Sequence, residues 1–298
     1  MKTKLSVIIP TFNRQQYLRK LLNQLDDQNL GNDIELSIIV VNDGSSDGTS
    51  EMLVNEFPHV ISIMGDGNWW WTRCVNEGIK MAVNLSTDFI LLLNDDNEIK
   101  DNYIFSLMQD YKTLTPGAIL GSASVSLDFN GTVIDSSGIK DFSKLFCEYT
   151  RFHPRNFRIN ENFHGIHECF CFSGRGTLIP KDTLLKLGLY DENMVQYGSD
   201  EDYILTAKEK GFPVFITWNA CVYNHSILTG KGKHPQNMSL RSYLSTFFNK
   251  YTNKSLSLNY YFYKKHCYPF LAPIYIIYYL AFNIGIFFLR KREKWATK

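Results

Sequence analysis

Two adjacent carboxylates, Asp95 and Asp96, end a short apolar run and are the residues of this chain best suited to chemistry. The run covers residues 89–93, and uninterrupted apolar stretches of this kind are typical of buried parallel strands. Ligands of open α/β sheets bind beyond the carboxyl ends of such strands. Two carboxylates placed there can hold a hard divalent cation, which in turn binds phosphate oxygens. The alternative is that they cap a helix that begins near residue 100.

Two more carboxylates follow the second apolar run, in the segment 42–49. This segment lacks the lysine and the glycine spacing of the common phosphate-binding loops. For Asp47 we favour a role as a helix cap, because a helical pattern begins directly after it. For Asp43 we favour a role in ligand binding, because its carboxylate could accept a hydrogen bond from the ring N–H of a uracil or thymine base.

Three consecutive acidic residues in the second half, Asp200, Glu201 and Asp202, begin a helical pattern that ends at Gly211. A carboxylate near a helix N-terminus is kept ionised by the helix dipole, which suits proton abstraction from a hydroxyl group. The alternative is that all three acids only cap the helix.

The elements that position these groups alternate along residues 1–115. We expect strands at 5–9, 34–41, 60–64 and 89–93, and helices at 14–25, 47–57, 73–85 and after residue 101. Strands that alternate with helices of about 10 to 15 residues are typical of a doubly wound, mostly parallel α/β sheet. The loops after the first, second and fourth strands are therefore expected to leave the same edge of the sheet.

Residues 116–230 change rhythm and are expected to form a second half of the same domain. Strands at 118–127 and 133–139 flank Asn130 and Gly131, a hairpin signal. Further on, the stretch 142–167 is irregular, 169–180 is extended, 200–210 is helical and 213–222 is a strand. We expect one domain over 1–230 and a helical extension over 231–298.

The extension contains an uncharged segment, residues 268–289, between basic residues at 264–265 and 290–292. Its length meets the threshold of a membrane-spanning helix, but two prolines and four tyrosines favour the membrane interface. The basic flanks suit an anionic leaflet. We expect membrane association, in the interface more than across the bilayer. The alternative is an aromatic helix packed on the rest of the chain.

Composition narrows the remaining classes. The chain has 298 residues and a net charge of +1, so no basic field favours a nucleic-acid partner. Six scattered cysteines, and a strand that leaves no room for a signal peptide, favour a cytoplasmic protein with free thiols. Cys169 and Cys171, with two nearby histidines, lack the ligand spacing of a zinc site.

Four motifs, in order, resemble those of the glycosyltransferase family 2 enzymes, which have the GT-A nucleotide-sugar fold. They lie at residues 7–14, 39–49, 67–79 and 92–96. The resemblance covers the chain from near residue 4 to near residue 225. The third motif, with its triple tryptophan, looks like the version in rhamnosyl- and hexosyltransferases of bacterial surface polysaccharides. Asn42 and Asn94 stand where the family more often has an acidic residue.

The resemblance implies a UDP- or dTDP-hexose donor and a metal cofactor, Mg²⁺ or Mn²⁺. Asp96 would hold the cation that bridges the diphosphate, Asp95 would lie nearer the sugar or ribose, and His225 resembles a late metal ligand of some GT-A enzymes. The other donor-site candidates are Pro10, Thr11, Arg14, Asp43, Trp69, Asn76 and Asn94.

Three of these assignments keep an alternative. Neighbouring residues of a helix point about 100° apart, so only one or two of Trp69, Trp70 and Trp71 are expected to wall the sugar or base site, and packing is the alternative. Asn76 either binds the donor or braces a loop. His225 is alternatively a structural residue.

For the second half the resemblance implies an inverting reaction with an acceptor. Asp200 falls on the position of the family's base, Glu201 is the second choice, and Asp202 either orients the base or caps the helix. The glycine-bearing loop that would lie beside the acceptor contains Gly174, Arg175 and Gly176. Its arginine either meets a phosphate or is solvated.

The expected acceptor is a saccharide, and the hydrophobic tail suggests that it is lipid-linked, at the cytoplasmic face of the inner membrane. A nucleotidyltransferase is the rival enzyme class, but it requires a glycine-rich basic loop after the first strand, which residues 10–13 lack. A non-catalytic scaffold that binds nucleotides or sugars is the second rival.

Overall fold

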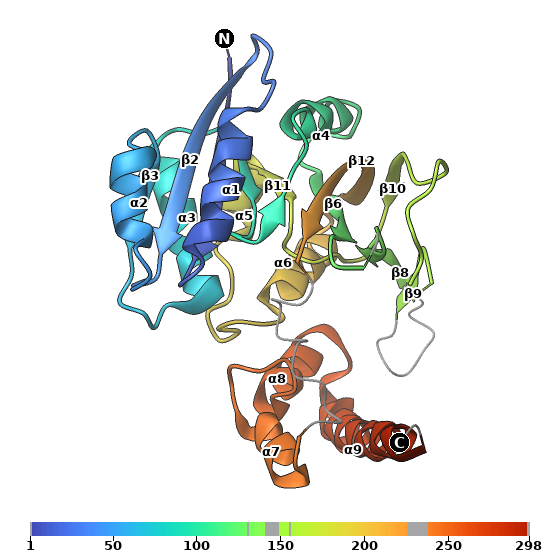
Figure 1. The fold of residues 1–298 in the computed structure, drawn as a ribbon. Coiled ribbons are helices and arrows are strands. Elements are labelled where there is room, and N and C mark those ends of the chain that lie inside the picture. Colours follow the sequence, from blue (N-terminus) through green and yellow to red (C-terminus); the bar gives the residue numbers. More distant parts are fainter. Residues whose placement is uncertain (1, 130, 141–148, 155, 226–237, 297–298) are drawn as a thin grey trace.

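One large sheet forms the centre of the molecule in the computed structural model, which describes residues 2–129, 131–140, 149–154, 156–225 and 238–296 (Figure 1). Its strands are β1 (Thr3–Thr11), β2 (Ile34–Asn42), β3 (Ile61–Met64), β4 (Phe89–Leu92), β5 (Asn97–Glu98), β6 (Ile119–Ser126), β7 (Val133–Asp135), β10 (Ile166–Glu168), β11 (Thr177–Pro180) and β12 (Val214–Asn224). A separate small sheet pairs β8 (Gly138–Lys140) with β9 (Tyr149–Arg151).

The strand order of the large sheet is β10-β12-β6-β11-β4-β1-β2-β3, with β5 beside β12 and β7 beside β6. The neighbours β3, β2, β1 and β4 are parallel, and β6 is parallel to β12. Between these two groups, β11 is antiparallel to both β4 and β6. The predicted α/β class with a mostly parallel sheet is confirmed.

Helices cover both faces of this sheet. On one face lie α1 (Gln15–Asp26), α2 (Thr49–Glu56) and α4 (Tyr103–Lys112), and on the other lie α3 (Trp70–Asn84), α5 (Lys181–Leu187) and α6 (Ser199–Glu209). Strand β1 supplies both cores, because side chains alternate along a strand: Val7 and Ile9 pack under α1, whereas Ile8 packs under α3.

Asp47 connects two helix starts. Its carboxylate accepts hydrogen bonds from the backbone N of Gln15 at 2.9 Å, and from the backbone N of Thr49 at 3.2 Å. These are the first residues of α1 and α2. Asp47 therefore satisfies N–H groups at two helix starts, although the N-cap residue of α2 itself is Gly48.

Several predicted boundaries are wrong. Helix α3 begins at Trp70 rather than at residue 73, and the strand predicted over 133–139 is interrupted near Ser137, which has a φ of +62°. Of the extended segment 169–180, only the last four residues form a strand, β11. The short elements β5, β9, β10 and α5 were not predicted.

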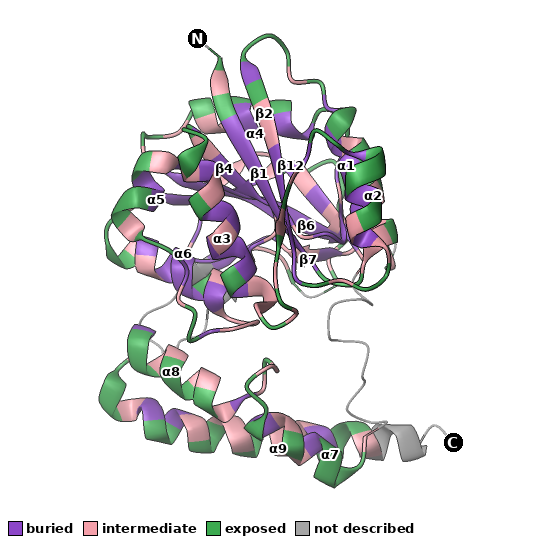
Figure 2. Ribbon diagram, turned by 90° about the vertical axis from the view of Figure 1, so that its left-hand side faces the viewer, coloured by how far each residue is buried: buried purple, intermediate pink, exposed green. Residues whose placement is uncertain are grey.

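The described part of the extension is helical and lies beside α6 and α3 (Figure 2). It contains α7 (Leu240–Ser245), the 3₁₀ turns η2 (Thr246–Phe248) and η3 (Pro269–Leu271), α8 (Leu256–His266) and α9 (Ala272–Ala296). Its small core is formed by Tyr243, Phe247 and Phe287. By length and composition, the segment Pro269–Lys291 could cross a membrane.

The cysteines do not all match the expectation of free thiols. Cys74, Cys169, Cys171 and Cys221 are free. Cys267, directly after α8, is disulfide-bonded. The expectation of six free thiols is therefore wrong.

Gly78 gives a test of how α3 packs on the sheet. A Cβ atom at this position would lie 2.3 Å from Cγ2 of Ile8. Alanine usually gains about 1 kcal/mol over glycine inside a helix, but overpacking costs about 1–3 kcal/mol. Because β1 is a central strand that has little room to shift, we expect Gly78→Ala to lower the free energy of unfolding, measured by urea denaturation.

The matched control is Gly285→Ala in α9, where nothing lies within 4 Å of the added Cβ. There the helix propensity acts alone, and we expect a gain of about 0.5–1 kcal/mol. Equal effects of the two substitutions would contradict the packing of α3 on β1.

Candidate active site

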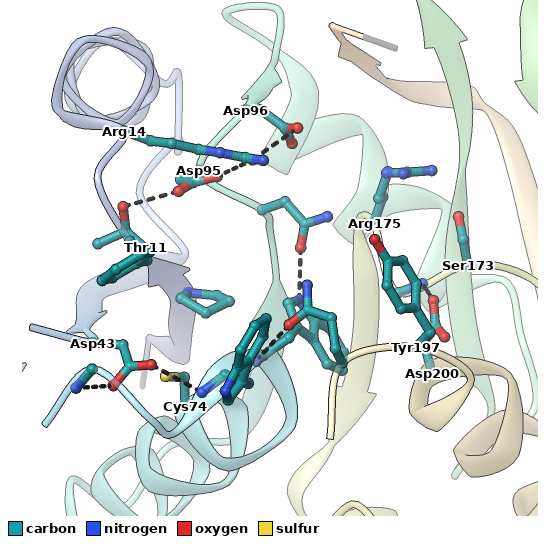
Figure 3. A pocket seen from close by; sticks show the side chains of 18 residues that line it. Thr11, Arg14, Asp43, Cys74, Asp95, Asp96, Ser173, Arg175, Tyr197 and Asp200 are labelled. Carbon is teal, nitrogen blue, oxygen red and sulfur yellow. Dashed lines mark hydrogen bonds and ion pairs between the residues drawn. The ribbon is translucent and has the colours of Figure 1, made fainter. Parts of the chain in front are cut away.

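A pocket of about 340 Å³ opens where the loops after β1, β2 and β4 meet the loop before β11 and the start of α6. In Figure 3, Thr11, Arg14 and Asp43 lie on one side of it, and Ser173, Arg175 and Asp200 on the other. The predicted site residues that line it are Pro10, Thr11, Arg14, Asp43, Asn94, Asp95, Asp96, Gly174, Arg175 and Asp200. The parallel strands thus bring their loops together as expected.

Asp95 and Asp96 enter the pocket directly after β4. Thr11 Oγ1 donates to Asp95 Oδ2 at 2.9 Å. Arg14 Nη1 lies 3.0 Å from Asp95 Oδ1 and 3.1 Å from Asp96 Oδ2. The next helix, α4, begins only at Tyr103, so the helix-cap alternative is wrong for these two acids.

Burial and charge act against each other in this cluster. Burial raises the pKa of Asp95 from 3.8 to about 6, although the Arg14 guanidinium lowers it. Burial lowers the pKa of Arg14, but the charges of Asp95 and Asp96 outweigh this and raise it. One guanidinium therefore faces two buried acids, and a second cation is electrostatically favoured there.

The donor set of this pair fits Mg²⁺ or Mn²⁺. Asp96 Oδ1 is buried and has no hydrogen-bond partner, and such an oxygen costs free energy unless it is satisfied. Hard cations prefer carboxylate oxygens. Within the described residues, no group of three or more His, Cys, Asp or Glu side chains could hold a metal ion. Substrate phosphates and water would have to complete the coordination.

His225 does not line the pocket. Its Nδ1 lies 3.1 Å from Asp128 Oδ1, and its Nε2 lies 3.2 Å from Glu98 Oε1. Both ring nitrogens are thus taken by neighbouring carboxylates. The structure places His225 in its structural alternative rather than in the predicted metal site.

Asp43 organises the loop between β3 and α3. Its Oδ1 accepts from the backbone N of Gly67 at 2.9 Å, and its Oδ2 accepts from the backbone N of Trp69 at 3.0 Å and of Trp70 at 2.9 Å. Trp70 has a φ of +57°, a conformation that costs a bulky residue about 1–3 kcal/mol. These hydrogen bonds stabilise it and start α3 earlier than predicted.

The early start of α3 changes which tryptophans face the pocket. Trp70 and Trp71, the first two residues of α3, line it, whereas Trp69, which precedes the helix, does not. The guanidinium of Arg73 lies 4.8 Å from the centre of the Trp69 ring. Trp71 Nε1 donates to Asn94 Oδ1 at 2.9 Å. Two tryptophans wall the pocket, but the assignment of Trp69 to the donor is corrected.

Asn76 and Gly176 lie behind the pocket wall. Asn76 Nδ2 donates to the carbonyl of Tyr190 at 3.0 Å, and the backbone N of Tyr190 donates to Asn76 Oδ1 at 2.9 Å. Asn76 therefore braces a loop, which was its alternative. A Cβ at Gly176 would lie 2.6 Å from the hydroxyl oxygen of Tyr103, so Gly176 packs against the core and not beside the acceptor.

Asp200 reaches the pocket from the first turn of α6. Its Oδ2 accepts from the backbone N of Gly174 at 2.9 Å, and its Oδ1 accepts from the backbone N of Glu201 at 3.0 Å. A Cβ at Gly174 would lie 3.0 Å from both Asp200 Cβ and Trp71 Cζ2. The glycine thus permits the close approach that fixes the carboxylate.

The start of α6 is also fastened to α3. Thr72 Oγ1 donates to Ser199 Oγ at 2.8 Å, and the backbone N of Trp71 donates to Gln196 Oε1 at 3.1 Å. The helix of the triple tryptophan therefore positions the helix that carries Asp200.

Asp202 points away from the pocket and toward the extension. Its carboxylate lies 2.7 Å from His266 Nε2 and 2.8 Å from Lys265 Nζ, and it is 2% exposed. His266 Nδ1 lies 2.9 Å from Glu209 Oε1. Asp202 therefore binds α8 to α6 and does not orient the base. Glu201 lines no part of the pocket, so its acceptor assignment is also corrected.

Several pocket residues were missed at the level of sequence. They are Phe12, Gly67, Cys74, Ser173, Gln196 and Tyr197. Phe12 lies inside the first motif, and Gln196 and Tyr197 closely precede the acidic triplet, so their position in the sequence was a usable signal. Gly67 and Cys74 lie inside the third motif in the same way, whereas no pattern indicated Ser173.

Residues 6–182 match the family profile described as "Glycosyl transferase family 2". "Glycosyltransferase GlyA" of Streptococcus pneumoniae is 27% identical over 172 residues, which cover 57% of this chain and 23% of that protein. "GalNAc(5)-diNAcBac-PP-undecaprenol beta-1,3-glucosyltransferase" of Campylobacter jejuni is 29% identical over 180 residues, which cover 54% of this chain and 56% of that protein. The matches thus span less than two thirds of either relative.

Among solved structures, GalNAc-T7 with UDP, GalNAc and Mn²⁺ superimposes with a TM-score of 0.59. The sequence identity is 15%, and the match covers 89% of this chain and 54% of that chain. This likeness concerns the fold alone.

The contacts of Asp202 predict a large difference between two histidine substitutions. The buried Asp202 carboxylate has two partners, Lys265 and His266, and His266→Ala removes one of them. We expect the free energy of unfolding in urea to fall by about 3 kcal/mol, as in other buried pairs that lose one partner.

The control is His59→Ala, which removes an exposed pair with Asp26 and is expected to cost no more than about 1 kcal/mol. Similar losses in the two variants would mean that the Asp202–His266 contact does not hold the extension.

Proposed function

Because the chain belongs to glycosyl transferase family 2, we propose that it transfers a hexose from a UDP- or dTDP-sugar to a hydroxyl group of a saccharide acceptor, with inversion at the anomeric carbon. One observation carries this proposal: a single pocket contains Asp95 and Asp96 at the end of β4, and Asp200 at the start of α6 (Figure 3). Asp95 and Asp96 are suited to bind the cation of a diphosphate. Asp200 is suited to take the proton of the acceptor hydroxyl.

On the donor side, the basic residues of the pocket bind and orient the diphosphate. Arg14 and Arg175 both line the pocket, and Arg175 Nε is buried without a hydrogen-bond partner. A guanidinium N–H in this position can donate to a phosphate oxygen. Asp96, through its unsatisfied Oδ1, and Asp95 would hold Mg²⁺ or Mn²⁺. Such a cation offsets the negative charge that develops on a leaving diphosphate.

The nucleoside is proposed to lie against the loops after β1 and β2. Pro10, Thr11 and Asp43 line this part of the pocket. The Asp43 carboxylate already accepts backbone hydrogen bonds from the loop before α3. It would therefore have two roles: it holds Trp70 in place and it binds the nucleotide base. Trp70 offers a flat apolar wall there.

On the acceptor side, Asp200 is proposed as the base. Two backbone N–H groups fix its orientation, and a carboxylate keeps further lone pairs for a substrate hydroxyl. Asp200 takes the proton of this hydroxyl while the hydroxyl oxygen attacks the anomeric carbon, and the nucleoside diphosphate leaves from the opposite face as its bond to that carbon breaks. Trp71 touches Gly174 and binds Asn94, so it can wall the space between donor and base with an aromatic face that suits sugar C–H groups.

The acceptor is proposed to be lipid-linked, in the synthesis of a bacterial surface polysaccharide at the cytoplasmic face of the inner membrane. The relative from Campylobacter jejuni has a name that includes an undecaprenol-linked saccharide. The apolar segment Pro269–Lys291 supports a location at a membrane.

Replacing Asp200 by Asn tests the base. We expect transfer, measured as release of nucleoside diphosphate in the presence of membranes that carry polysaccharide precursors, to fall by about 10²–10⁴-fold. Nucleotide binding should be unchanged, because Asn can still accept from Gly174. Glu201→Gln is the matched control and should retain activity. Unchanged activity of Asp200→Asn would contradict its role as the base, and loss in Glu201→Gln would move the base by one residue. No release by the wild-type protein would favour a scaffold.

Thermal stabilisation by UDP, dTDP, GDP and CDP, with and without Mn²⁺, tests the donor site. We expect UDP or dTDP with Mn²⁺ to raise the Tm by about 3 °C or more. In Asp96→Asn the Mn²⁺-dependent part should be lost. A larger Tm increase with dTDP than with UDP would favour rhamnose as the transferred sugar. No change of Tm with any nucleotide would contradict the donor site.

A further inference from the structure

Helix α9 has an outer face that no described part of the chain covers. Every exposed residue between positions 273 and 289 is apolar, and together they recur with helical spacing along a single side. This α9 outer face consists of Pro273, Ile274, Ile277, Tyr278, Ala281, Phe282, Gly285, Phe288 and Leu289. Phe270, which is 74% exposed, continues it at the N-terminal end.

The opposite face of α9 packs lengthwise on the other helices of the extension. The ring of Tyr275 stacks on Tyr263 of α8 at 4.8 Å, and the ring of Phe287 stacks on Tyr243 of α7 at 4.5 Å. Figure 2 shows α9 lying along the base of the extension, on the side away from the large sheet. The α9 outer face therefore points away from the large sheet and its pocket.

Charge is segregated between the extension and the rest of the chain. Residues 231–298 contain 12 Lys and Arg residues and one acidic residue, Glu293. Residues 1–230 contain 19 basic and 29 acidic residues. Lys264 and Arg290, near the two ends of the α9 outer face, are exposed. An apolar strip with basic residues at its ends complements an anionic lipid surface.

The packing argues for a helix in the plane of the membrane and against a spanning helix. Helices α7 and α8 lie beside α9 over much of its length and carry Arg241 and Lys264, and Lys254 lies just before α8. If α9 crossed the bilayer, these charges would enter the hydrocarbon region at a large cost in free energy. With α9 in the plane, only the apolar face needs to enter the lipid.

We infer that the α9 outer face docks the protein on an anionic bilayer leaflet, with α9 in the membrane plane. This docking specifies how the protein would reach the membrane location of the proposed function, and its link to a lipid-linked acceptor rests on that proposed function. Because α8 is held to α6 through Asp202 and His266, docking of α9 also fixes how the pocket stands above the membrane.

Flotation of the full chain with phosphatidylcholine vesicles, with and without phosphatidylglycerol, tests the docking. Wild-type protein should float with the anionic vesicles. Ile277→Asp should weaken this binding at least about tenfold, because Ile277 is 71% exposed at the middle of the face. Arg290→Gln should weaken it about fivefold, and only on anionic vesicles.

The matched control is Val54→Asp on α2, where the side chain is 73% exposed; its binding should equal that of wild type. Equal flotation of Ile277→Asp and wild type would overturn the inference, as would resistance of the bound protein to high salt and alkaline extraction, which indicates a spanning helix. A soluble dimer that Ile277→Asp dissociates, without vesicle binding, would assign the face to a second copy. Nucleotide-induced stabilisation measured in the same variants keeps failure of the docking apart from failure of the proposed function.

Discussion

Two carboxylates buried at the end of a central strand need a positive charge next to them, and Arg14 supplies it from the loop after β1. This requirement constrains the first half of the chain. Arg14 directly precedes α1, so the pairing of β1 with β4 has to bring the start of that helix over Asp95 and Asp96. Thr11, the last residue of β1, completes the contact through its hydroxyl group. The guanidinium meets only part of the demand, since Asp96 Oδ1 stays buried without a partner. The same unsatisfied negative charge, which costs the fold free energy, favours the binding of a cation in this cluster.

The sequence predicted the first half of the fold well because its signals there are local. The spacing of apolar residues predicts burial both in the run at 89–93 and at the α1 leucines 18, 21, 22 and 25. The site residues that follow strand ends, such as Asp95 and Asp43, could be placed by the same logic. Trp69 could not, because the start of α3 depends on a carboxylate 26 residues earlier in the chain that binds its backbone. Asp202 could not either: its partners Lys265 and His266 lie in the extension, and nothing in the local sequence links them. In the second half, short strands such as β10 and β11 are defined by their neighbours and carry little pattern of their own.

The helix that carries Asp200 is held from two directions. On one side, Thr72 and Trp71 of α3 bind Ser199 and Gln196, and on the other, α8 binds Asp202 and Glu209. The position of Asp200 within the pocket therefore depends on the first half of the chain and on the extension together. Strand β11, antiparallel between β4 and β6, provides the rigid seam across which these parts meet.

The uneven distribution of charge gives this nearly neutral chain a strong electric dipole. A surface of negative charge would exert a torque on it before any contact forms, turning the basic extension forward and the acidic sheet domain outward. At physiological ionic strength this torque acts within about 8 Å of the surface, so orientation and capture happen in one encounter. A net charge of +1 conceals this polarity completely; it becomes visible only when the chain is divided where the helical extension begins.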